Sequence, residues 1–363
     1  MPDKSVQSPL VALRQTLQRL AVPLSLRITL GAFVVSTLIG IGLVGLLGFP
    51  MGRALQTSVQ GAFGDVSAIA DTLVFMTPRL LVALGALIAI RGGMFNLGGE
   101  GQLQFGAIGA MIPFLALGDQ GWVLIPLCIV SGAICGALWG LIPAILKITR
   151  GSDEIIVTLL MNFIAIYFLK FLVQGPLQPE GSNFNMSAKL PDRALLPTLI
   201  DGTRLHAGVL LAIVAAILTW VLIHHTAFGL RLRAAGASPR FFRLQGAKPG
   251  AMTIKVMLVS GGFGGLAGAV EVMGVQYRLI DGFSTGIGFE GLAVAFLGGL
   301  EAFGALFVAL YFGAVNSATL ALQAKLSVPS SLAEIMTGLP ILILAVAYGL
   351  LALKGKPVWT LTR

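Results

Sequence analysis

Charged side chains are scarce in this chain of 363 residues: Asp, Glu, Lys and Arg make up 11% of it, against about 25% in an ordinary soluble domain. Acidic residues are the scarcer kind, with 15 Asp and Glu against 24 Lys and Arg and a formal net charge of +9. Hydrophobic residues make up 56%, more than a soluble protein of this length could bury. The scarcity of charge excludes a disordered chain, a nucleic-acid-binding module and a conventional soluble enzyme, and indicates a polytopic membrane protein.

Cysteine and catalytic motifs are also rare or missing. The only cysteines, Cys128 and Cys135, are seven residues apart in one apolar run, roughly 10 Å along a helix and too far for a disulfide. The sequence has no GxxxxGK[ST] phosphate-binding loop, no nucleophile–base arrangement and no group of residues with metal-ligand spacing. We expect no catalytic residue, no metal site and no cofactor in this chain. If ATP drives the protein, a partner subunit must bind it.

Long apolar runs, by contrast, are abundant. A membrane-crossing helix needs about 20 apolar residues. Ten runs approach this length: 29–49, 70–90, 102–117, 122–146, 155–175, 207–225, 252–274, 286–300, 302–322 and 333–353. The third and the eighth are short and rich in glycine, which is typical of broken or tilted helices. The predicted fold is an all-α polytopic membrane protein with about ten transmembrane helices, some of them short or broken.

The distribution of basic residues predicts the orientation in the membrane. With a cytoplasmic N-terminus, the inner segments hold 16 Lys and Arg and the outer loops hold 6. Basic residues favour the cytoplasmic side, so we expect both termini to be cytoplasmic. Residues 1–28 then form a cytoplasmic amphipathic segment, 29–353 the transmembrane domain with a basic inner loop at 226–251, and 354–363 a cytoplasmic tail.

Two glycine-rich segments, 98–109 and 288–299, indicate an internal repeat with an offset of 190 residues. The matching positions are Gly98 with Gly288, Glu100 with Glu290, Gly101 with Gly291, and Gly109 with Gly299. In the predicted topology the first copy runs outward and the second inward. Predicted helices two to five and seven to ten would therefore be inverted repeats, a pattern typical of transporters whose pathway lies at the repeat interface.

Polar residues beside or within the apolar runs are candidates for the translocation pathway. A carboxylate or amide in the membrane is costly and needs a partner, water or a function. Irregular glycine-rich backbone cannot face lipid and must face protein or a wet cavity. Two interpretations of the glutamates stay open: they order a turn at a helix end, or they line the pathway. For Asn162, in the middle of the run 155–175, the alternatives are an interhelical hydrogen bond or a substrate contact. The candidates are Asn96, Gly98, Glu100, Gly101, Gln102, Asn162 and Glu290.

Three stretches of the sequence resemble a known family. Residues 91–106 (RGGMFNLGGEGQLQFG) look like the signature of permease subunits of ABC importers of the ribose and branched-chain amino-acid type. Residues 234–249 (AAGASPRFFRLQGAKP) are similar to that family's coupling loop, where a short helix docks on the ATPase. Residues 152–165 (SDEIIVTLLMNFIA) most resemble the nucleoside and simple-sugar branch.

The resemblance implies a permease subunit of an ATP-driven importer in the bacterial inner membrane, with nucleosides as the favoured solute, that works by alternating access. Simple sugars and branched-chain amino acids remain alternatives, as does an ion-coupled secondary transporter. The implied partners are ATPase subunits that carry ATP and Mg, a second permease that is identical or homologous, an extracytoplasmic solute-binding lipoprotein, and membrane lipid, with no nucleic acid. The residues implied in ATPase coupling are Gly236, Arg240, Phe241, Leu244 and Gly246.

Overall fold

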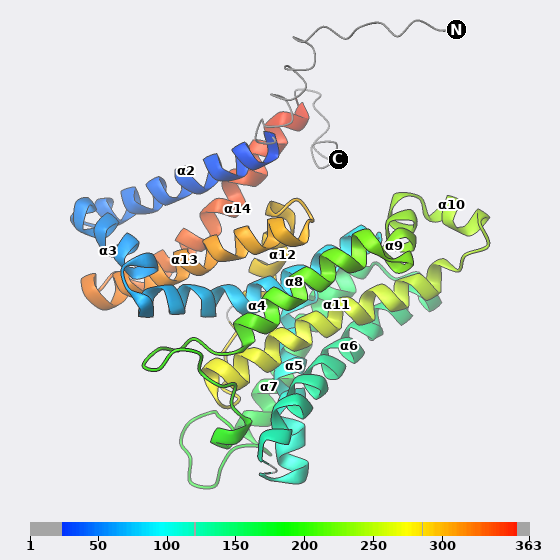
Figure 1. Cartoon of the computed structure of the whole chain (residues 1–363), viewed down its shortest axis with the longest axis horizontal. Coiled ribbons are helices and arrows are strands. Elements are labelled where there is room, and N and C mark those ends of the chain that lie inside the picture. The colour runs from blue at the N-terminus through cyan, green and yellow to red at the C-terminus, as the bar shows by residue number, and fades with distance from the viewer. Residues whose placement is uncertain (1–23, 120, 285, 354–363) are drawn as a thin grey trace, which may run out of the picture. The chain divides into compact units, whose positions relative to one another are not determined.

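The computed structural model describes residues 24–119, 121–284 and 286–353 (Figure 1). The chain divides into two compact units, one made of Met1–Met51 with Ser330–Arg363 and the other of Gly52–Pro329. Helices make up the regular structure of these ranges, so the all-α expectation is confirmed for them. Most of the predicted amphipathic segment at 1–28, and the whole predicted tail at 354–363, lie outside the described residues.

The first unit pairs two apolar helices, α2 (Leu24–Leu46) and α14 (Ser330–Leu353). Gly40 lies so close to the partner helix that an added Cβ atom would meet the Met336 side chain at 3.0 Å. Small residues at helix crossings allow such close approach, which matters in lipid because packing drives helix association there.

The second unit is a helical bundle around two largely buried helices, α4 (Val66–Arg91) and α11 (Pro249–Glu271). α11 packs on α5 and α6, while α4 packs on α12 and α13, and the two central helices also contact each other. The other helices are α3 (Met51–Phe63), α5 (Gly99–Leu117), α6 (Leu124–Arg150), α7 (Glu154–Gln174), α8 (Gly208–His225), α9 (Ala227–Ala237), α10 (Pro239–Leu244), α12 (Ile287–Leu297) and α13 (Ala302–Leu326). Short helical turns lie at Gly121–Val123, Asp192–Ala194 and Val272–Gln276.

Glycine determines how closely α6 and α11 approach. A Cβ atom on Gly136 would lie 2.5 Å from the Gly265 Cα atom, and one on Gly265 would lie 2.2 Å from the Gly132 carbonyl oxygen. These backbones are in direct contact, so no larger residue fits without moving a helix. The glycines spaced by four along α6 therefore form a packing face.

Each of the ten predicted apolar runs falls on a helix, but only seven candidate membrane spans occur within the described residues, judged by length and composition. These are Thr29–Leu46, Val66–Arg91, Gly121–Arg150, Glu154–Gln174, Gly208–His225, Pro249–Gln276 and Ala302–Leu326. α12 has 11 residues, roughly 16 Å of helix against a hydrocarbon core of about 30 Å. A chain that crosses the membrane several times is supported, while the count of ten stays a prediction.

The connection from α7 to α8 packs on the segment that follows α11. The Ser187 amide donates to the Leu279 carbonyl and the Leu190 amide to the Tyr277 carbonyl, each at 2.9 Å. Backbone groups away from regular helices need such partners when they are buried. This long connection is therefore attached to the bundle at the end where α8 begins.

Candidate functional site

The start of α5 is surrounded by a buried hydrogen-bond network, which we call the polar junction. The Asn96 side-chain amide donates to Ser260 Oγ at 2.8 Å and to Gln102 Oε1 at 3.1 Å. Its carbonyl oxygen accepts from the Gly98 amide at 2.8 Å and from Gln102 Nε2 at 3.2 Å. The segment before α5 is therefore tied to α11, which carries Ser260. The polar junction consists of Asn96, Gln102, Thr158, Asn162 and Ser260, each exposed by 4% or less.

The same junction extends to α7. Asn162 Oδ1 accepts from the Gly101 amide, and Asn162 Nδ2 donates to the Leu97 carbonyl, both at 2.8 Å. The Leu97 amide in turn donates to Thr158 Oγ1 at 3.1 Å. Asn162 thus makes interhelical hydrogen bonds and caps backbone groups that the irregular glycine-rich segment leaves free.

Glu100 joins the beginnings of two helices. It lies in the first turn of α5 and is 1% exposed. Its carboxylate accepts hydrogen bonds from Ser284 Oγ and, at 2.8 Å, from the Gly288 amide in the first turn of α12. A Cβ atom on Gly288 would lie 2.1 Å from the Glu100 backbone nitrogen, so only glycine fits at this contact. A carboxylate that accepts the free amides of a helix start is electrostatically favourable. This geometry favours the helix-terminal interpretation of Glu100.

Glu290 occupies the matching position at the start of α12 and has a different partner. Its carboxylate pairs with the Arg79 guanidinium of α4, and Arg79 also donates to the Phe75 carbonyl at 2.7 Å. The side chains are 6% and 16% exposed, so the pair is largely removed from solvent. Arg79 is not among the site residues predicted from the sequence. An arginine inside an apolar run was the available signal, because such residues require a counter-charge.

Glu271, the last residue of α11, is a second buried residue that was not predicted from the sequence, and it is 6% exposed. Its carboxylate accepts a hydrogen bond from Gln276 Nε2 at 3.0 Å. It is the only acidic residue of the apolar run 252–274, which was a usable signal. Glu100, Glu271 and Glu290 are thus little exposed, and each has a polar partner.

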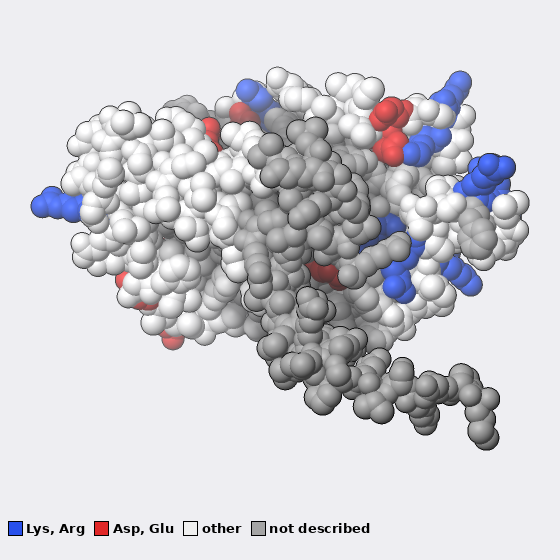
Figure 2. Space-filling model, turned by 90° about the horizontal axis from the view of Figure 1, so that it is seen from above, with Lys and Arg blue, Asp and Glu red and all other residues white. Residues whose placement is uncertain are grey.

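The residues implied in ATPase coupling lie at an exposed basic end of the second unit, whereas the polar junction is buried. The short helix that the resemblance implied within 234–249 is present as α10. Its Leu244 is 79% exposed, and Arg240 is exposed to solvent. Gly246 has a φ of +77°, which suits glycine at the turn after α10. The side chain of Phe241 is outside the described part of the structure. Basic side chains gather at this end of the second unit, on the right of Figure 2.

Gly236 of α9 packs against the end of α4. A Cβ atom there would lie 2.1 Å from the Arg91 carbonyl oxygen, so α9 contacts the end of α4 through backbone. Arg91 donates to the Leu300 carbonyl at 2.7 Å and pairs with Glu301 just before α13. The α9–α10 end is therefore connected through α4 to α13. No group of residues suited to hold a metal ion occurs among those described.

These features define a class: a helical membrane protein with a polar interior and an exposed basic end. Over residues 68–345 the chain matches the family described as "Branched-chain amino acid transport system / permease component". The chain belongs to this permease family. No solved structure matches it.

Similarity to individual permease proteins refines the family assignment. The chain is 33% identical to the guanosine ABC transporter permease protein NupP of Bacillus subtilis over 313 residues, which are 85% of this chain and 90% of the relative. It is 31% identical to the glucose ABC transporter permease protein TsgB13 of Haloferax volcanii, with 76% of this chain and 75% of the relative covered. It is 30% identical to the nucleoside ABC transporter permease protein NupB of Lactococcus lactis, with 79% and 81% covered. The resemblance noted in the sequence is thereby confirmed.

Proposed function

We propose that this chain is the transmembrane permease subunit of an ATP-driven importer of nucleosides. The observation that carries the proposal is the similarity to the guanosine permease NupP, which extends over 85% of this chain. The similarity to the nucleoside permease NupB supports the same solute class. A simple sugar is the second candidate, because TsgB13 is a glucose permease and is 31% identical.

The proposed mechanism is alternating access between two inverted repeats, the first of which includes α4, α5 and α6 and the second α11, α12 and α13. The helix packing supports this arrangement: α11 lies on α5 and α6, and α4 lies on α12 and α13. The matched glutamates Glu100 and Glu290 both lie in the first turn of a short or glycine-rich helix. Repeats related in this way can rock about a central pathway. The polar junction and the Arg79–Glu290 pair are the proposed interior of that pathway.

Energy would come from separate ATPase subunits that carry ATP and Mg and dock on α10. The exposed Arg240 and Leu244 offer charge and apolar contact, and Gly236 passes displacement to the end of α4. The full importer would contain a second permease, identical or homologous, and an extracytoplasmic solute-binding lipoprotein. In this arrangement the protein lies in the bacterial inner membrane, with both termini and the 226–251 loop in the cytoplasm.

Reconstitution tests the function directly. The permease complex, with its ATPase subunits and binding protein, is placed in liposomes loaded with ATP, and uptake of labelled guanosine, glucose and leucine is measured. We expect concentrative guanosine uptake that requires both ATP and the ATPase. Concentrative uptake by the permease alone would contradict an ATP-driven importer. Uptake of glucose in place of guanosine would overturn the nucleoside assignment and leave the importer assignment in place.

A further inference from the structure

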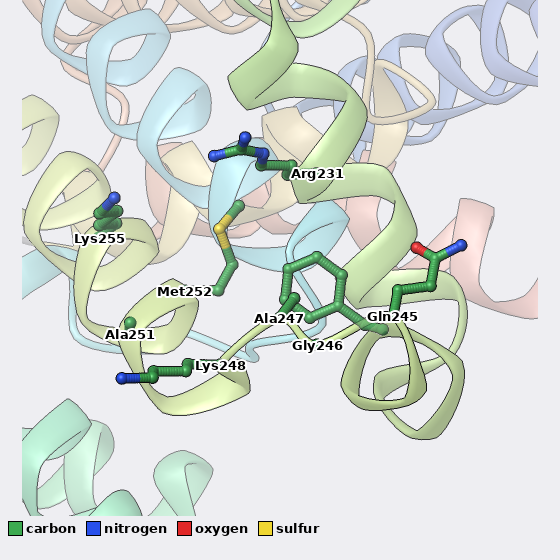
Figure 3. Close-up of a pocket in the computed structure, with 9 residues that line it drawn as sticks. Arg231, Gln245, Gly246, Ala247, Lys248, Ala251, Met252 and Lys255 are labelled. Atoms are coloured by element: carbon green, nitrogen blue, oxygen red, sulfur yellow. The ribbon is translucent and has the colours of Figure 1, made fainter.

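A cavity of about 410 Å³ lies between α9 and the beginning of α11, beside the turn that follows α10 (Figure 3). Its volume is within the range of pockets that bind small molecules. Figure 3 shows Arg231 of α9 and Met252 and Lys255 of α11 around the same space. The residues that characterise this basic cavity are Arg231, Phe242, Gln245, Lys248, Met252 and Lys255.

The basic cavity has three cationic side chains and no carboxylate among its lining residues. Among the ion pairs of the described residues, none involves Arg231, Lys248 or Lys255. Lys147 at the end of neighbouring α6, by contrast, is paired with Glu154 at 2.6 Å. Cations that line one cavity without a counter-charge repel one another, and a bound anion would relieve this repulsion.

The cavity lies where a membrane span begins. The candidate span Pro249–Gln276 starts directly after Lys248, and Lys255 lies within it, roughly 10 Å along the helix from Lys248. A lysine inside a span calls for a partner or a function. Under the predicted orientation this is the cytoplasmic surface, where anionic lipids attract clustered Lys and Arg.

Apolar side chains lie in the cavity and beside it. Phe242 and Met252, both 6% exposed, provide apolar walls. A Cβ atom on Gly250, at the start of α11, would contact the Ile148 side chain at 3.5 Å, and Ile148 is 43% exposed. Charge at the opening and exposed aliphatic side chains beside it match a molecule with an anionic head and an apolar tail.

We propose that the basic cavity binds the phosphate headgroup of an anionic phospholipid, with Arg231, Lys248 and Lys255 around the phosphate. The acyl chains then lie along the exposed aliphatic face of α6 that includes Ile148. A free phosphate ion would use the cations but not the apolar surface, so the lipid is favoured. The bound headgroup joins α9, the turn after α10 and α11, which makes the position of α10 dependent on lipid. The proposal concerns lipid binding and does not depend on the identity of the transported solute.

Lipid binding by the purified full-length chain tests the proposal. Native mass spectrometry in detergent measures retention of added phosphatidylglycerol and phosphatidylcholine, with inorganic phosphate as competitor. We expect selective retention of phosphatidylglycerol. The double variant Lys248→Gln/Lys255→Gln should bind it about 25-fold more weakly, because each basic residue near an anionic lipid contributes about a factor of five. The charge-preserving Lys248→Arg/Lys255→Arg variant and the control Arg150→Gln, at the exposed end of α6, should retain it.

Three outcomes would overturn the lipid assignment: equal retention of the two lipids, unchanged retention in the glutamine variant, or displacement by phosphate at a concentration equal to that of the lipid. A glutamine variant with the same melting temperature as the arginine variant excludes misfolding as the cause of any loss. Since the measurement uses neither ATP nor solute, its failure leaves the proposed transport function untouched, and failure of transport leaves the lipid site untouched.

Discussion

The polar interior of the second unit and its basic end use polar residues in opposite ways. In the polar junction the side chains are at most 4% exposed and all three amide side chains have both donor and acceptor partners. At the basic end Leu244 is 79% exposed, and Arg240 lies in solvent. Polar groups buried in the bundle hold helices together, because leaving them unpaired is costly. Unpaired groups on the surface are available to a partner.

This contrast predicts where substitutions affect stability and where they affect assembly. Changes in the interior should lower the free energy of unfolding, and changes at the basic end should leave it nearly unchanged. Four predictions test this, in order of decreasing effect on stability.

The largest effect is expected for Arg79→Ala, which leaves the Glu290 carboxylate largely buried without its counter-charge. Removal of one partner of a buried ion pair costs about 3–5 kcal/mol. The measurement is the free energy of unfolding in detergent micelles. The double variant Arg79→Ala/Glu290→Gln should recover part of the loss, and Lys325→Ala, at an exposed residue at the end of α13, serves as the control. If the single and double variants are equally unstable, the pair does not act as a unit.

Glu100→Ala should cost about 2–3 kcal/mol, because it leaves the Gly288 amide and the Ser284 hydroxyl without their acceptor. Glu100→Gln keeps one acceptor oxygen and should cost less. Unfolding in micelles and transport are measured on the same preparations. A fully stable Glu100→Ala protein that no longer transports solute would favour the pathway-lining interpretation over the helix-terminal one.

His206 should make stability depend on pH. It is 1% exposed, and burial, followed by the nearby Arg204 charge, lowers its pKa from 6.5 to about 4. Between these values the unfolded chain binds a proton that the folded protein does not, so stability is lost as the pH falls from 6.5 toward 4. The expected loss from pH 7 to pH 5 is about 2 kcal/mol. Unfolding of the wild type and His206→Gln at both pH values measures it, and an identical pH dependence in the variant would contradict the assignment to His206.

The smallest effect on stability is expected for Arg240→Ala/Leu244→Ala, within about 0.5 kcal/mol of wild type because both side chains are exposed. The same variant should lose most of the co-purifying ATPase. Arg193→Ala/Leu199→Ala, which removes an exposed arginine and an exposed leucine from the α7–α8 connection, is the matched control and should keep the ATPase. Normal ATPase recovery with the α10 variant would show that docking takes place elsewhere.

Much of the helical framework could be predicted from the sequence. Each apolar run falls on a helix because helix formation in a membrane follows from local composition and length. α3 was missed because it is amphipathic and contains Gln56, Ser58 and Gln60, so no long apolar run marks it. The run 102–117 was expected to form a broken or tilted helix. It lies within the continuous helix α5, whose glycines are at its first turn and at helix contacts.

The site was predictable only in part. The sequence showed that Asn96, Gln102 and Asn162 are polar residues in an apolar chain. It did not show that Asn162 caps the Gly101 amide from another helix. Arg79 and Glu290 are 211 positions apart, and no local pattern connects them.

Composition and the order of apolar runs were sufficient to establish a multi-pass helical membrane protein. The reason is that the free energy of transfer from water into lipid is a sum of contributions from local segments of the chain. Tertiary structure decided which polar residues pair, which are left exposed, and that cations from α9 and α11 surround one cavity. Those properties depend on distances between segments far apart in the chain, since the energy of a charge or a hydrogen bond is determined by its nearest partners.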